Sequence, residues 1–155
     1  MSGRPRLWGR LASVRALARP DDGSAIVEFV ALAVVLLVPL FYLVMTLARL
    51  QAGTYAASAA AREAGRAFVS APAAAEAPGR ARAAADLAFA DQGFAGEGDL
   101  VLQCDGDPCL RPDGRVRAVA AVTVPFPLLP AFFRDVVPLE IPISVTHVAT
   151  VERFR

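Results

Sequence analysis

The chain has 155 residues, enough for one modest domain, and 55% of them are hydrophobic. All 16 basic residues are arginine and the formal net charge is only +1, so the composition gives no reason to expect nucleic-acid binding. The charge is nevertheless uneven, because residues 1–23 carry a net +3 and residues 24–155 a net −2. Residues 1–23 therefore form a basic leader, which is either a short amphipathic helix around Leu7–Leu11 on the inner membrane face or a disordered tail.

An uncharged apolar run follows the leader. Phe29 to Ala48 are 20 residues without a charge, and a helix of that length spans the roughly 30 Å hydrocarbon core of a bilayer. A soluble helix seldom needs so long an uncharged run. Basic flanks stay in the cytoplasm, so the sequence predicts a single-pass protein of the cell membrane that contacts the lipid bilayer. Its N-terminus is expected to be cytoplasmic and its C-terminal domain extracytoplasmic.

The apolar run is expected to belong to a longer helix. Asp21–Ser24 supplies acidic and hydroxyl side chains suited to a helix start. Pro39 is expected to kink the helix, which transmembrane helices tolerate. The Ala-rich sequence continues to about Phe68, so residues 24–69 are predicted to form a transmembrane and extended helix.

Small residues recur every four positions in the second half of this helix, at Gly53, Ala57, Ala61 and Gly65. A stripe of small side chains lets another helix approach closely. The alternative is that the alanines only supply helix propensity. We therefore treat the stripe as a candidate helix-packing surface.

Residues 70–155 are predicted to form a small extracytoplasmic α+β domain. A short helix is expected at Arg80–Asp91, after Pro78 and Gly79. Period-two patterns then predict strands with one apolar face. The apolar positions are Val116, Ala118, Ala120, Val122 and Val124 in one strand, and Ile141, Ile143 and Val145 in another; Leu100–Gln103 adds a short strand. The expected fold class is α+β, with a single N-terminal transmembrane helix extended outward and packed on a small antiparallel sheet.

Proline-rich apolar sequence, Pro125–Phe133, separates the later strands. Its prolines exclude a central strand. It is expected to form a loop or short helix that covers the sheet or rests near the membrane surface.

Cys104 and Cys109 are the only cysteines, and both lie in the expected outer domain. The intervening sequence is rich in turn-forming residues, and an oxidising compartment permits a disulfide. Free thiols are the alternative. A metal site has little support, since two cysteines at this spacing with one distant histidine make a weak zinc signature.

The most specific motif is Gly23-Ser24-Ala25-Ile26-Val27-Glu28-Phe29, followed at once by the apolar run. A carboxylate such as Glu28 at the mouth of a membrane span usually has a partner. The motif resembles the class III signal of type IV pilin-like proteins, and specifically the TadE-like proteins of the tight-adherence (Flp) pilus system. Residues 59–66 and the closing strand up to Arg153 are also similar to that family. Pro39 departs from it, because it lies further from Glu28 than is usual there.

The resemblance implies that a prepilin peptidase cleaves between Gly23 and Ser24, and that the mature chain is a minor pilin or pseudopilin. Its implied partners are that peptidase, the major Flp pilin, other TadE/TadF-type subunits and the Tad inner-membrane platform. Glu28 and Phe29 would then act in assembly, with Glu28 neutralising the new ammonium group of Ser24 or of a neighbouring subunit. The plainer interpretation of Glu28 is an acid placed at the positive end of the helix dipole.

Enzymatic activity has little support in the sequence. His147 is the only histidine and fits a surface or edge-strand position, and no catalytic or nucleotide-binding motif is present. Asp105-Gly106-Asp107 fits a turn better than a calcium loop. We therefore expect neither catalytic residues nor a metal or other cofactor. The rival functions are an uncleaved envelope scaffold protein and a membrane-tethered binding module.

Overall fold

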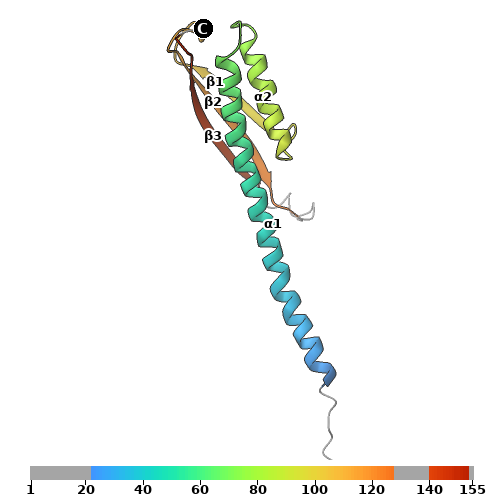
Figure 1. Cartoon of the computed structure of the whole chain (residues 1–155). Coiled ribbons are helices and arrows are strands. Elements are labelled where there is room, and N and C mark those ends of the chain that lie inside the picture. The colour runs from blue at the N-terminus through green and yellow to red at the C-terminus, as the bar shows by residue number, and fades with distance from the viewer. Residues whose placement is uncertain (1–21, 128–139, 154–155) are drawn as a thin grey trace, which may run out of the picture. The chain divides into compact units, whose positions relative to one another are not determined.

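The computed structural model describes residues 22–127 and 140–153 of the chain (Figure 1). The elements are α1 (Asp22–Val69), α2 (Ala77–Asp91), β1 (Gly98–Cys104), β2 (Arg115–Pro125) and β3 (Glu140–Thr150). They fall into two compact units, Met1–Pro39 and Leu40–Arg155. The expected leader helix around Leu7–Leu11, and the part of the proline-rich segment beyond Pro127, lie outside the described residues.

The first unit contains the beginning of α1. The helix starts at Asp22, within the segment predicted as its start, and Pro39 lies inside it rather than ending it. Proline has no amide hydrogen to give to the carbonyl one turn earlier, so this position lacks one backbone hydrogen bond of the helix. Apolar side chains such as Leu32 and Val35 are exposed all along this part of α1.

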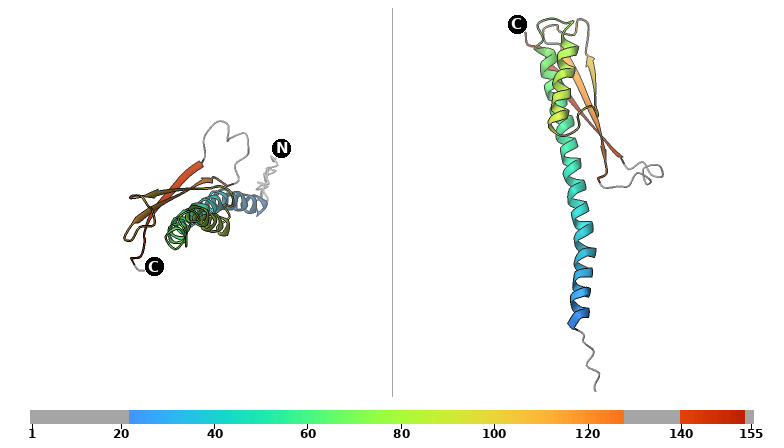
Figure 2. Two further views of the ribbon diagram at one scale, coloured as in Figure 1. Left: turned by 90° about the horizontal axis from the view of Figure 1, so that it is seen from above. Right: turned by 90° about the vertical axis from the view of Figure 1, so that its right-hand side faces the viewer.

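The second unit, Leu40–Arg155, is called the outer unit below and has two layers. The later part of α1 and the whole of α2 lie side by side on one face of a three-stranded antiparallel sheet, as the two views in Figure 2 show. The strand order is β1-β2-β3, so β2 is central and the other two strands are edges. This arrangement confirms the predicted α+β class, a long apolar N-terminal helix packed on a small antiparallel sheet.

Alternation along β2 sorts its side chains between the two faces of the sheet. The predicted apolar positions are all buried at 3% exposure or less: Val116, Ala118, Ala120, Val122 and Val124. Between them, Arg115, Arg117 and Thr123 are exposed. In β3 the predicted inward residues are half-buried, because an edge strand is covered less completely. β1 extends further than expected, pairing with β2 from Gly98 to Cys104.

The stripe of small residues on α1 contacts the chain's own sheet, which corrects the expectation that it receives another helix. A Cβ atom added at Gly53 would collide with Val124 and lie 3.2 Å from Ile143. A Cβ atom at Gly65 would lie 3.2 Å from the Cβ of Ala149. Ala57 and Ala61, between these glycines, have no exposed surface. The small residues therefore let α1 lie close against β2 and β3.

Helix α2 begins three residues earlier than predicted, at Ala77. Pro78 and Gly79 lie in its first turn, where proline costs no hydrogen bond because the first amides of a helix have no intrahelical partner. Its buried residues follow helical spacing on one face: Ala77, Ala81, Ala85, Ala88 and Phe89. Arg82 also donates a hydrogen bond of 2.9 Å to the carbonyl of Leu100, which ties α2 to β1.

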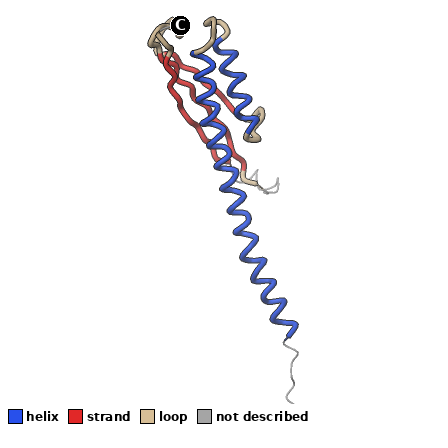
Figure 3. Tube along the Cα trace, viewed as in Figure 1, coloured by secondary structure: helices blue, strands red, loops and turns tan. Residues whose placement is uncertain are grey.

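The loop between β1 and β2 is one of the tan segments in Figure 3. It is closed by the predicted disulfide between Cys104 and Cys109, whose Cα atoms are 5.4 Å apart. Asp105 reinforces the loop in two ways. Its carboxylate accepts a hydrogen bond of 3.0 Å from the amide of Arg115 and lies 3.0 Å from the guanidinium of Arg111. The loop is thus built as a turn, as predicted from its composition.

Candidate functional site

Gly23 and Ser24, the predicted cleavage site, lie in the first turn of α1. The first four amides of a helix have no intrahelical hydrogen-bond partner, so this turn is the one held least firmly by the backbone. A peptidase that needs an extended substrate would unwind only this turn. The predicted site therefore lies in a terminal turn of α1, where few backbone hydrogen bonds would have to break.

Glu28 and Phe29, the predicted assembly residues, are both exposed on α1, and Phe29 keeps 71% of its surface accessible. Within the described ranges no basic side chain forms an ion pair with Glu28. A lone carboxylate beside a long apolar surface is costly in lipid unless a partner is supplied. Among the described residues the carboxylate of Glu28 is thus exposed and has no ion-pair partner.

Exposed apolar surface surrounds the helix from Ile26 to Leu47. Valine, leucine and phenylalanine side chains on every side of α1 keep about half or more of their surface accessible, among them Leu36 at 66% and Phe41 at 61%. Monomeric soluble proteins rarely expose contiguous apolar surface on this scale. From Ala25 to Val69 the helix is long and apolar enough to cross a membrane, as an anchor or as a signal.

The described residues of the outer unit contain no candidate metal centre. His147 lies on edge strand β3, as predicted, but its ring points inward, with Cδ2 3.3 Å from the position of a Cβ at Gly65. In residues 22–127 and 140–153 no group of three or more His, Cys, Asp or Glu side chains could hold a metal ion.

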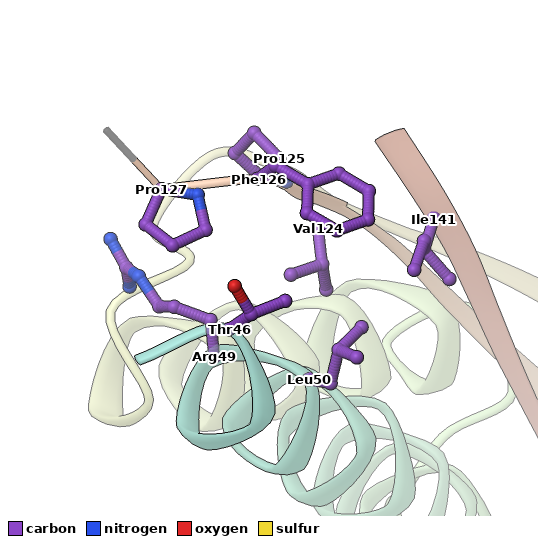
Figure 4. Close-up of a pocket in the computed structure, with 8 residues that line it drawn as sticks. All are labelled: Thr46, Arg49, Leu50, Val124, Pro125, Phe126, Pro127 and Ile141. Carbon is purple, nitrogen blue, oxygen red and sulfur yellow. The ribbon is translucent and has the colours of Figure 1, made fainter. Parts of the chain in front are cut away.

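A surface that the sequence indicated only in part, through the Pro125–Phe133 segment, lies where the sheet meets α1 (Figure 4). Thr46, Arg49 and Leu50 of α1 face Val124, Pro125, Phe126, Pro127 and Ile141 across a narrow seam. The seam is partly open to solvent and too narrow to hold a water molecule. We call Arg49, Phe126, Pro127 and Ile141 the boundary surface. The sequence feature that could have indicated this surface is Arg49, the first charged residue after the 20-residue uncharged run.

Arg49 is held by an aromatic contact. Its guanidinium carbon lies 5.9 Å from the centroid of the Phe94 ring, a cation–π distance. Phe94 is itself buried and follows the end of α2, where Gly93 turns the chain with a φ of +80°. The position of the arginine therefore depends on how α2 ends.

No family model, no curated protein and no solved structure matches this chain. The class is therefore defined by the architecture. A long apolar N-terminal helix, a small antiparallel sheet and a disulfide in the outer unit form a pilin-like arrangement.

Proposed function

We propose that this chain is a minor pilin or pseudopilin, a structural subunit of Flp-type pilus assembly. A prepilin peptidase would cut it between Gly23 and Ser24. The mature chain would stay in the cell membrane by α1, with the outer unit on the extracytoplasmic side. It would be a substrate of the peptidase and not an enzyme itself.

The observation that carries the proposal is the apolar surface of α1. This surface begins within one turn of the cleavage motif and contains a single carboxylate, Glu28, before Arg49. Lipid would cover such a surface before assembly, and helices of neighbouring subunits would cover it afterwards. The same helix continues into the outer unit, where its small residues are used against the sheet. The exposed apolar half is thus the part of α1 left for contacts between subunits.

The role of Glu28 follows from the new N-terminus. Cleavage would leave an ammonium group on Ser24, four residues before Glu28 and about one helical turn away. In a membrane or a fibre, where charges are poorly solvated, an ammonium group and a carboxylate would pair within one subunit or between two. The partners we propose are the peptidase, the major pilin, other TadE/TadF-type subunits and the inner-membrane platform.

Glu28→Gln is expected to weaken association between subunits while leaving the fold unchanged, because the amide removes the charge and keeps the size. We would place a photoreactive amino acid at Phe29, illuminate intact cells and measure the fraction of chain crosslinked to another subunit. A large loss of crosslinking is expected for Glu28→Gln.

The matched control is Glu63→Gln, which removes an exposed acid from the same helix beyond the apolar run. Crosslinking at Phe29 should persist in this variant. Equal crosslinking in all three proteins would count against an assembly role for Glu28, and absence of crosslinks in every protein would count against lateral helix packing.

A further inference from the structure

The boundary surface lies where the uncharged run of α1 stops. Its arginine directly follows Ala48, the last residue of that run. The preceding residues, from Leu40 onward, belong to the same compact unit as the sheet. Their apolar side chains are exposed, including Leu43 at 53% and Leu47 at 49%. The end of the predicted membrane span, residues 40–48, therefore belongs to the outer unit.

This continuity sets the level of the boundary surface relative to lipid. Phe126, Pro127 and Ile141 line the same seam as Thr46 and Arg49, so they lie beside the last turn of the apolar run. If that turn reaches the edge of the hydrocarbon, the three apolar residues reach the same depth. All three are half-buried, so part of each apolar side chain stays accessible.

The charges at this end suit the headgroup layer. Arginine at the end of a membrane helix extends its guanidinium to the interface, where it can bind phosphate through two parallel hydrogen bonds. The guanidinium carbon lies over the Phe94 ring, and among the described residues the guanidinium donates no hydrogen bond to another side chain or carbonyl. In residues 22–127 and 140–153 no carboxylate forms an ion pair with Arg49.

Glu140 limits the depth. It is exposed at the start of β3, opposite Pro125 in the register of the sheet. A carboxylate resists entry into hydrocarbon, because its charge loses the water that solvates it. The surface is thus suited to the polar headgroup layer and not to the acyl region below it.

We propose that the boundary surface contacts the phospholipid headgroup layer of the membrane and holds the outer unit against it, with Arg49 bound to lipid phosphate. The inference rests on the membrane insertion of α1 in the proposed function and goes beyond the assignment as a pilin. This headgroup contact would hold the outer unit at the bilayer surface before the subunit is extracted for assembly.

Depth-dependent fluorescence quenching in the full chain tests whether the boundary surface lies at the headgroups. Trp8 is the only tryptophan, so a Trp8→Phe background allows one new tryptophan at a time. The three sites are Leu36→Trp in the span, Phe126→Trp on the boundary surface and Leu87→Trp on the exposed face of α2. Each protein is reconstituted in vesicles of phosphatidylcholine and phosphatidylglycerol, with nitroxide either on the headgroup or deep in the acyl chain.

The expected result is loss of emission from position 36 with the deep nitroxide, from position 126 with the headgroup nitroxide, and from position 87 with neither. Quenching at position 36 with none at position 126 would overturn the headgroup contact but would still support the membrane span. No quenching at position 36 would contradict both the membrane span of α1 and the headgroup contact of the outer unit. Far-UV circular dichroism confirms that each variant keeps its helix and strand content.

The role of the arginine is tested in the Phe126→Trp protein. Arg49→Gln is expected to lose much of the headgroup quenching, and Arg49→Lys, which keeps the positive charge, to retain most of it. Unchanged quenching in the glutamine variant would overturn the phosphate contact.

Discussion

Replacing Phe89 by alanine is expected to lower the free energy of unfolding of the outer unit by about 3–5 kcal/mol, the range for removing a buried phenylalanine. The Phe89 side chain is 1% exposed and lies between α2 and the sheet. A Cβ atom added at Gly98 of β1 would collide with its ring, so the strand and the ring are in close contact. The backbone carbonyl of Phe89 also accepts a hydrogen bond of 2.9 Å from the amide of Phe94. The cavity left by alanine would therefore loosen α2 and β1 together.

Hydrogen exchange of the β2 amides, measured by mass spectrometry in detergent, reports this stability without requiring the apolar part of α1 to unfold. The matched control is Leu87→Ala, two residues away on the same helix and 64% exposed. Its effect should stay within about 0.5 kcal/mol, as for ordinary surface substitutions. Similar losses in the two variants would contradict the assigned core.

The second large effect is expected at Gly53. Gly53→Leu should destabilise the outer unit by at least about 1–3 kcal/mol, the range for overpacking, because even a Cβ atom collides with Val124. Val124 is 2% exposed, and its branched side chain has few rotamers to move into. The larger side chain would push α1 away from the sheet. The same exchange measurement on β2 gives the magnitude.

Gly79→Leu is the matched control for this change. Gly79 lies in the first turn of α2, and a Cβ atom there meets nothing within 4 Å. The substitution should be neutral or stabilise slightly, since leucine has the better helix propensity. A loss as large as that of Gly53→Leu would contradict the attribution of the Gly53 effect to overpacking between α1 and the sheet.

Local patterns predicted the sheet because alternation reports burial directly. Val116 to Val124 could bury one face only by pairing as strands, and the structure pairs them. The spacing of Cys104 and Cys109 and the turn residues between them likewise predicted the disulfide. Interactions within a few residues, or with a period of two, are specified by the local sequence.

The partner of the small-residue stripe could not be predicted in this way. A period of four at Gly53 and Gly65 shows that something approaches closely but not whether it is a helix or a sheet. The start of α2 was misplaced for a related reason, since Pro78 can precede a helix or occupy its first turn. The boundary surface needed the structure, because it joins residues of α1 to the end of β2 and the start of β3. Processing at Gly23 and the role of Glu28 stay predictions.

The most direct test of the proposed function is the mature N-terminus of the protein purified from its native membranes, determined by intact mass and terminal sequencing. We predict a chain that starts at Ser24, and accumulation of the full-length chain in a Gly23→Ala variant. An uncleaved leader in both proteins would contradict processing by a prepilin peptidase and would leave an envelope protein permanently anchored by α1.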